Sequence, residues 1–358
     1  MKHKIFYLIF LVSLLNFSQE KLIDSLAKEF LRDTTHYGIA FGVQKGNSIS
    51  TSYYGGKYSQ IDENISKRTL FEIGSVTKIY TTYILSALEI EGKLKSESLL
   101  INYLPNNFKN KKVLSSITLT NLATHTSGIP ITAWDDWNEL QKEENFNEDN
   151  PFDLLTKEFL YTKLEKVESL NEYGVPRYSN FGFGLLTVIL EEVTGLKYAD
   201  LLEKYVTKPL QLGSTFTEVP ETRIHDVAMA HKNGVQVPFI QLSDSKGTGA
   251  IKTSIDELLN FLTLLTMPSE DNKVKAIQEH ALRTPFNNER LKAVGSGWGI
   301  FYLENEKIFW KNGGTYGSGS IVIICPNKEI SLAILCNSDS TDLIQGYAIK
   351  LMKKLLII

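Results

Sequence analysis

The sequence contains few cysteines and no long basic run, and each of these absences excludes a class of protein. Only two of its 358 residues are cysteine, so a small scaffold held together by many disulfides is excluded. The formal net charge is −3, and no cluster of Lys and Arg is long enough to follow a phosphate backbone. We therefore expect no nucleic acid among its partners.

Three common enzyme motifs are also absent. The sequence has no Gly-x-Ser-x-Gly, which excludes the nucleophile turn of the usual α/β-hydrolases. It has neither the Gly-x-x-x-x-Gly-Lys-Ser/Thr phosphate loop nor the His-Glu-x-x-His zinc motif, and its six histidines never pair at a spacing suited to a metal. We accordingly expect neither a metal ion nor another cofactor.

The N-terminal residues are typical of an export signal. Lys2 and Lys4 precede the apolar run 5–17, and the small residue Ser18 follows. A basic head, an apolar run and a small residue at the cut indicate a signal peptide over residues 1–18. The run is too short to span about 30 Å of hydrocarbon comfortably, so we expect no stable membrane span after cleavage; an uncleaved anchor is the alternative. The mature protein is then expected to be secreted or periplasmic.

The chain as a whole has an ordinary globular composition. Hydrophobic residues make up 42% and charged residues 22%, which excludes disorder and collagen-like repeats. At about 150 residues per domain, the length fits one large domain or two intimately connected ones. We find no internal repeat and assign residues 19–358 to one domain.

Strand-like patterns lie toward both ends of this domain, and helix-like periodicity dominates its middle. An amphipathic helix over 21–32 precedes two strands within 38–54. Residues 134–150 are acidic and lack apolar spacing, so we expect an exposed excursion there. Further helices are expected at 75–90, 182–193, 198–206, 254–266 and from 341 onward, and further strands at 229–237, 298–303, 308–311, 321–325 and 330–336.

This order of elements predicts an α/β fold of the α+β type. Residues 19–95 and 221–358 are expected to form an antiparallel sheet flanked by helices, with a mostly helical subdomain, 96–220, inserted between them. Cys325 and Cys336 lie on two apolar runs joined as a hairpin. With Cys325 near the turn, Cys336 lies roughly 20 Å away at strand rise, too far for a disulfide. We expect both to be core thiols.

A serine and a lysine lie three residues apart where the helix 75–90 is expected to begin. In the segment GSVTK, residues 74–78, Ser75 and Lys78 share one helical face, so the amine can reach the hydroxyl. A desolvated lysine with a lowered pKa can activate such a serine, and the helix start offers free N–H groups to a developing oxyanion. Ser-x-x-Lys also occurs elsewhere in the chain, so by itself this pattern favours an ordinary helix cap.

Two further motifs follow along the chain. Tyr178-Ser179-Asn180 is the sole Tyr-x-Asn of the sequence. Lys311-Asn312-Gly313 follows a strand-like segment and leads into a glycine-rich stretch, where a substrate backbone can approach closely beside a positive charge. A second Lys-x-Gly, at 232–234, falls in the expected hairpin 229–237 and is interpreted as structural.

Ser75-x-x-Lys78, Tyr178-x-Asn180 and Lys311-x-Gly313, in this order, resemble the motifs of the serine β-lactamase and penicillin-binding-protein superfamily. The Tyr of the second motif is most similar to the class C-like branch, which includes esterases and D-amino-acid peptidases. The resemblance runs from about Gly38 to Asn337. Four other segments fit the same family: 69–78, 122–130, 208–213 and 249–254.

The resemblance implies a role for each motif residue. Ser75 would be the acylated nucleophile, Lys78 would keep it deprotonated, and Tyr178 would shuttle the proton. Asn180 would orient the acyl chain and Lys78. Lys311 would supply positive potential to Tyr178 and to a substrate carboxylate. Because a nearby cation favours a phenolate, we expect the pKa of Tyr178 to be lowered.

The resemblance also implies a binding surface. The backbone N–H groups of Ser75 and Gly314 would form the oxyanion hole, and Asn312, Gly313 and Thr315 would contact the substrate. Asn312 stands where dedicated β-lactamases and transpeptidases usually have Thr or Ser, whose hydroxyl contacts the substrate carboxylate. An amide has a different reach, which favours an esterase or peptidase over an efficient β-lactamase.

Several other side chains are weaker candidates. His125 invites comparison with a Ser-His pair, but its segment is a structural turn in the family, so we expect no catalysis by it. Trp134, Trp137 and Tyr316 could line the cleft, although aromatic side chains more often pack in a core.

Together, the motifs predict a secreted serine hydrolase that forms an acyl-enzyme on Ser75. Its substrate would be a small molecule or peptide with an ester, amide or β-lactam bond, and its specificity would lie in loops such as 131–150. The enzymatic alternative is a D-Ala-D-Ala carboxypeptidase or D-aminopeptidase acting on cell-wall peptides. A non-catalytic cell-wall binding or sensor module is the alternative from another class, although all three motifs are complete here.

Overall fold

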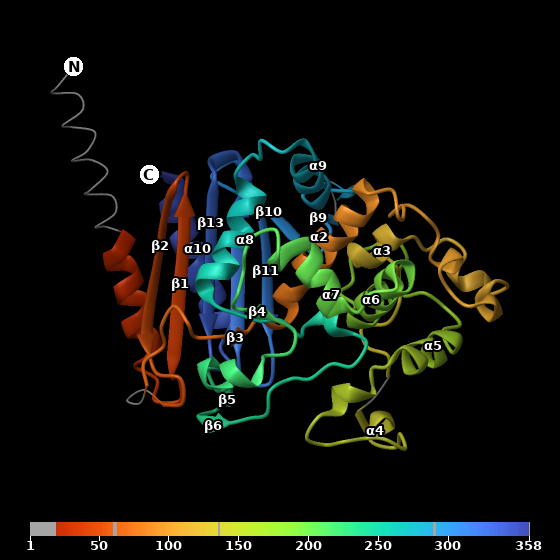
Figure 1. The fold of residues 1–358 in the computed structure, drawn as a ribbon, viewed down its shortest axis with the longest axis horizontal. Helices are drawn as coiled ribbons and strands as arrows, with labels where there is room; N and C mark the ends of the chain where they lie inside the picture. The colour runs from red at the N-terminus through yellow and green to blue at the C-terminus, as the bar shows by residue number, and fades with distance from the viewer. Residues whose placement is uncertain (1–18, 60–62, 135–136, 289–290, 358) are drawn as a thin grey trace.

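The computed structural model describes residues 19–59, 63–134, 137–288 and 291–357 (Figure 1). The predicted signal peptide, residues 1–18, lies outside these ranges. Within them, an antiparallel sheet of eight strands has helices on both faces, and helices α2 to α7 lie mainly to one side of it. This architecture confirms the predicted α+β fold.

The sheet joins the two ends of the described chain. In spatial order its strands are β2 (Ser48–Gly55), β1 (Gly38–Lys45), β13 (Ile330–Cys336), β12 (Gly319–Cys325), β11 (Glu306–Gly314), β10 (Gly299–Leu303), β9 (Leu291–Val294) and β8 (Phe286–Asn288). β1 pairs antiparallel with β13, so that Ile39 lies opposite Cys336 and Lys45 opposite Ile330. Strands from the first and last parts of the sequence are therefore direct neighbours.

The central strands are buried on both faces, which explains their continuous apolar runs. Ile321 and Ile323 of β12 share a core with α10 (Thr341–Ile357) and with a helix over residues 19–30. Val322 and Ile324, which alternate with them, share the other core with α8 (Ile255–Thr266). Figure 1 shows α8 and α10 on opposite sides of the sheet.

Both cysteines are buried free thiols, as predicted. Cys325 pairs with Ile330 beside the hairpin turn, whereas Cys336 pairs with Gly319 at the far end of the same two strands. Their separation along the strands is the physical reason that no disulfide links them.

The helices follow the predicted periodicity, with shifts at their ends. The predicted helix 75–90 consists of a 3-10 turn, Gly74–Val76, followed by α2 (Thr77–Ile90). The predicted helix 198–206 is α7 (Tyr198–Leu202) continued by a π-helical turn, Glu203–Thr207. The predicted helix 182–193 is α6 (Asn180–Thr194). No range was predicted for four further helices, α3 (Leu119–Ala123), α4 (Trp137–Leu140), α5 (Lys157–Glu165) and α9 (Asn272–Ala281).

Short strands form two small sheets outside the main one. β3 (Phe71–Glu72), β7 (Lys252–Thr253) and β4 (Thr215–Phe216) make one of them. β5 (His231–Lys232) and β6 (Val235–Gln236) make the predicted hairpin, although each strand is only two residues long. Within the described ranges, no helix combines the length and apolar character that crossing a bilayer requires.

The expected exposed excursion at 134–150 is confirmed for most of the described residues of this segment, with two exceptions. Leu140 of α4 is fully buried, and Trp134 packs against the core that α8 shares. Trp137 is exposed and contacts Phe146 edge-on, with ring centroids 5.9 Å apart. The apolar residues of this segment are too few for their spacing to reveal a buried face in the sequence.

The layer between α10 and the sheet should contribute strongly to stability. Leu351 is fully buried on α10, so Leu351→Ala leaves a cavity and should lower the free energy of unfolding by about 2–5 kcal/mol. Ile349→Ala on the same helix is the control, because Ile349 is 41% exposed. Urea unfolding measures both; equal effects of the two substitutions would contradict this packing.

Candidate active site

Ser75 lies in the 3-10 turn that precedes α2, directly against the end of β11. A Cβ atom on Gly74 would lie 2.6 Å from the carbonyl oxygen of Gly314, and one on Gly313 would lie 2.7 Å from the backbone nitrogen of Ser75. Both positions therefore require glycine. Ser320 on β12 donates to the carbonyl of Ile73 at 2.7 Å and fixes the turn to the sheet.

Lys78 is fully buried one turn after Ser75. Its Nζ lies 3.1 Å from Ser75 Oγ, 2.8 Å from Asn180 Oδ1 and 2.7 Å from the carbonyl oxygen of Thr248. Burial, together with the positive charge of Lys311, holds the pKa of Lys78 well below its usual value. A lysine in this state can take the proton of a neighbouring serine.

Tyr178, two residues before the start of α6, also contacts Ser75. Its hydroxyl lies 2.5 Å from Ser75 Oγ. The turn that carries it is anchored by Ser179, which caps α6 by accepting from the Gly182 N–H at 2.8 Å and donates to the Pro130 carbonyl at 2.6 Å. Asn180 is the first residue of α6, so this one cap places both Tyr178 and Asn180.

Lys311 completes the cluster from β11. Its Nζ lies 4.7 Å from the centroid of the Tyr178 ring, and the Nζ of Lys78 lies 5.1 Å from the same centroid. Burial lowers the pKa of Lys311 to about 8. Both amines therefore give up their charge readily.

The expected lowering of the Tyr178 pKa is wrong. Burial raises the pKa of Tyr178 to about 12, and the hydrogen bond with Ser75 opposes this rise only in part. The physical reason is that desolvation penalises a phenolate here more strongly than two easily discharged amines can favour it. The resting phenol is neutral.

The remaining residues of the third motif have separate surroundings. Asn312 follows Lys311 on the strand and points to the opposite face, where its amide donates to Gln345 Oε1 of α10 at 3.2 Å. Thr315 lines the cavity beside Ser75, and its hydroxyl donates to the buried Glu72 at 2.7 Å. Substrate contacts by Asn312, Gly313 and Thr315 remain predictions. Because the Asn312 side chain points toward α10, its orientation does not favour a contact between Asn312 and the substrate.

His125 packs behind Tyr178 rather than beside Ser75. Its ring centroid lies 4.5 Å from that of Tyr178, and its Nδ1 accepts from the Ser179 N–H at 3.1 Å. Burial holds the pKa of His125 well below its usual value, so the ring is neutral. This placement supports a structural function for the segment 122–130.

A cavity of about 290 Å³ opens beside Ser75. Asn180 and Thr315 contribute polar groups to it. Of the three aromatic candidates, Trp134 and Tyr316 line it, although packing in a core was the favoured expectation, whereas Trp137 is not part of its described lining. Its other walls are mainly apolar. Among the described residues, no group of three His, Cys, Asp or Glu side chains could hold a metal ion.

Sequence reasoning missed two groups that shape this site. The carbonyl of Thr248 accepts from Lys78, but backbone acceptors leave no trace in a residue pattern. Glu72 accepts from Thr315 and from the Ile240 N–H at 2.8 Å, and pairs with Lys252 at 3.2 Å. A carboxylate three residues before the nucleophile, within an otherwise apolar strand, is the signal that could have revealed Glu72.

Comparisons with known proteins agree with the motif order. A family model described as Beta-lactamase matches residues 23–354. A Beta-lactamase of Providencia stuartii is 26% identical over 245 residues, 68% of this chain and 59% of that protein, so the match spans less than two thirds of that relative. A Beta-lactamase of Pseudomonas fluorescens is 25% identical over 353 residues, 89% of this chain and 93% of that protein. The fold is shared with a class C beta lactamase from Rhodobacter sphaeroides, with TM-score 0.81, 20% identity and coverage of 94% of this chain and 99% of that one.

The buried charge of Lys311 should cost stability in a pH-dependent way. Below pH 8 Lys311 is protonated in both folded and unfolded protein. Between about pH 8 and the usual lysine pKa of 10.5, only the unfolded chain keeps the proton, so stability rises with pH. Lys311→Met removes this penalty and should raise the free energy of unfolding at pH 7 by about 1–3 kcal/mol.

The advantage of Lys311→Met should shrink as the pH rises through that window, which urea unfolding at pH 7, 9 and 10.5 measures. Lys67→Met, at an exposed lysine, is the control. A Lys311→Met variant that is less stable than the parent at pH 7, or whose difference is independent of pH, would refute the assignment.

Proposed function

The chain belongs to the β-lactamase family, and we propose that it is a serine hydrolase that forms an acyl-enzyme on Ser75. The observation that carries this proposal is the position of the Ser75 hydroxyl, 3.1 Å from the Lys78 amine and 2.5 Å from the Tyr178 hydroxyl. A serine becomes nucleophilic only when a neighbouring base can take its proton. This serine has two partners for proton transfer.

In the first step, Ser75 Oγ attacks the carbonyl carbon of an ester, amide or β-lactam while its proton passes to Lys78. Lys78 is the better first base, because its pKa is lowered by burial whereas the pKa of Tyr178 is raised to about 12. The backbone N–H groups of Ser75 and Gly314 would bind the oxyanion of the tetrahedral intermediate. The close packing of the Gly74 turn against Gly314 supports that pairing.

In the second step, the bond to the leaving group breaks, and the leaving oxygen or nitrogen takes the phenolic proton of Tyr178. The proton held by Lys78, whose Nζ lies 5.1 Å from the centroid of the Tyr178 ring, then passes to the phenolate and restores the phenol. Lys311, over the ring of Tyr178, favours the transient negative charge. Water then hydrolyses the acyl-enzyme by the same groups in reverse, releasing the acid and free Ser75.

We also propose that the protein is exported, because residues 1–18 have the pattern of a signal peptide. Its partner would be a small-molecule or peptide substrate. The intact mass of the protein recovered from expressing cells tests the export signal. A mass that lacks residues 1–18 supports it, and a full-length mass contradicts it.

The acyl-enzyme chemistry is tested by covalent labelling. Incubation with a fluorophosphonate should add one probe mass, located by peptide mapping on Ser75. Ser75→Ala should remain unlabelled. The proposal fails if the parent protein forms no adduct, or if Ser75→Ala is labelled to the same extent.

The two proton-transfer partners should act as a unit. Lys78→Ala and Tyr178→Phe should each lower kcat/KM for a p-nitrophenyl ester by about 10³ or more, and the double variant should lose little beyond the worse single one. Tyr302→Phe is the control, because Tyr302 is 68% exposed. Independent, multiplicative losses, or a Tyr178→Phe variant with parental kcat, would contradict the proton path.

A further inference from the structure

The cavity beside Ser75 has apolar walls contributed by segments that are far apart in the sequence. Trp134, Phe152, Leu155, Leu160, Ile240 and Leu242 form most of them. Its described lining contains no Lys, Arg, Asp or Glu side chain. A charged group placed in this cavity would lose its hydration without gaining a partner, whereas an apolar group would gain the full benefit of burial.

The position of Tyr178 determines which part of a substrate enters the cavity. Tyr178 touches Ser75 Oγ but is not part of the described lining. The residue is 37% exposed, although the protein packed around its ring desolvates the hydroxyl enough to raise its pKa. The leaving group must lie beside the Tyr178 hydroxyl in order to take its proton. It therefore lies on the open side of Ser75, and the acyl group, on the other side of the reacting carbonyl, extends into the cavity.

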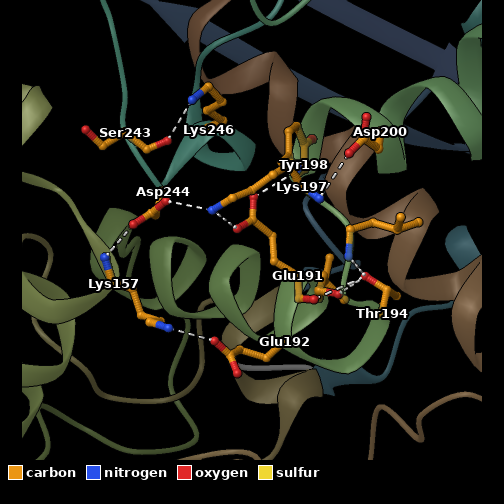
Figure 2. Close-up of polar contacts among 12 residues, drawn as sticks. Lys157, Glu191, Glu192, Thr194, Lys197, Tyr198, Asp200, Ser243, Asp244 and Lys246 are labelled. Carbon is orange, nitrogen blue, oxygen red and sulfur yellow. Dashed lines mark hydrogen bonds and ion pairs between the residues drawn. The ribbon is translucent and has the colours of Figure 1, made fainter.

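The cavity is held open by polar contacts behind its walls. Asp244, between the cavity residues Leu242 and Ser245, accepts from the Lys157 N–H at 2.9 Å and pairs with Lys197 at 3.3 Å (Figure 2). Lys197 also pairs with Glu191 of α6 at 3.3 Å. These contacts fix the 242–245 wall to α5 and α6 before any ligand arrives, which lowers the cost of ordering it on binding.

Aromatic rings form another part of the cavity wall. Phe152 stacks on Tyr316 with centroids 5.7 Å apart, and Trp134 lies 6.2 Å from Phe152. The volume of about 290 Å³ corresponds to roughly eight to ten non-hydrogen atoms, if each takes about 30 Å³ as a water molecule does.

We propose that this cavity selects the acyl group of the substrate, and that this group is an uncharged apolar chain or ring of about eight to ten non-hydrogen atoms. This inference rests on the acyl-enzyme chemistry proposed above. It favours esters and amides of medium-chain or arylalkyl carboxylic acids over cell-wall stem peptides, whose acyl side carries peptide and charged groups.

A series of esters with one leaving group tests the selection. With p-nitrophenyl acetate, butyrate, hexanoate, heptanoate and octanoate, kcat/KM should rise about two- to four-fold for each added methylene until the cavity is full. The p-nitrophenyl ester of methoxyethoxyacetic acid has the length of the heptanoate but two ether oxygens. After correction for its rate with hydroxide, it should react at least ten-fold more slowly than the heptanoate. A flat series, or equal rates for this pair, would overturn the inference.

A glycine on α6 allows the cavity to be shortened. A Cβ atom on Gly184 would lie 3.3 Å from Leu160 Cδ1 and 3.5 Å from Ser245 Cβ, both in the lining. Gly184→Val should lower the heptanoate-to-acetate ratio of kcat/KM at least ten-fold, and Gly184→Ala should lower it less. The alanine variant keeps the test informative if valine prevents folding, since alanine favours a helix over glycine.

Gly346→Val is the matched control, because Gly346 is also helical but has nothing within 4 Å of an added Cβ. Its heptanoate-to-acetate ratio should equal that of the parent. A ratio that Gly184→Val leaves unchanged would overturn the inference.

Titration with a fluorophosphonate distinguishes failure of the cavity assignment from failure of the acyl-enzyme chemistry. A protein that is labelled on Ser75 but shows no preference for apolar acyl groups refutes the cavity assignment alone. A protein that is never labelled refutes the acyl-enzyme chemistry itself.

Discussion

The buried amine of Lys78 forms hydrogen bonds with three of the segments that make the site. Lys78 Nζ contacts Ser75 at the start of its own helix, Asn180 at the start of α6 and the carbonyl of Thr248. Three oxygen acceptors match the three donors of an ammonium, and a neutral amine in the same place can accept from the Ser75 hydroxyl instead. The same geometry therefore serves both protonation states, and any shift of α2, α6 or the 248 segment would disturb it.

Reactivity and stability oppose each other at this centre. Lys252, a short distance behind the cavity, is paired with the carboxylate of Glu72 at 3.2 Å. The described structure pairs neither Lys78 nor Lys311 with a carboxylate, and burial lowers the pKa of both. A salt bridge would stabilise these ammonium groups and remove their capacity to exchange protons near neutral pH. The proposed chemistry therefore requires that no carboxylate pairs with Lys78 or Lys311. Burying two unpaired amines lowers the stability of the fold, and the apolar packing of the sheet layers must offset that loss.

The site also separates its polar and apolar functions in space. Tyr178 is partly exposed, whereas Asn180 and Thr248, which accept hydrogen bonds from the buried Lys78, border the cavity, and the other walls of the cavity are mainly apolar. Glu72 links two parts of the cavity wall, because its carboxylate accepts hydrogen bonds from the Thr315 hydroxyl and from the Ile240 N–H. A change in the apolar part of the wall can therefore alter the preferred acyl group while Asn180 and Thr248 continue to hold Lys78.

The sequence by itself determined the fold class, the buried strands and the order of the three motifs, because apolar periodicity and the i, i+3 spacing of Ser75 and Lys78 are local properties. The opposite orientation of Asn312 was also available from the two-residue period of a strand. The contact between Tyr178 and Ser75, the raised pKa of Tyr178 and the apolar cavity were decided only by the tertiary structure. Each depends on how completely segments that are distant in the sequence exclude water from the region around Ser75. Such burial results from the packing of the whole fold, so no short stretch of residues reveals it.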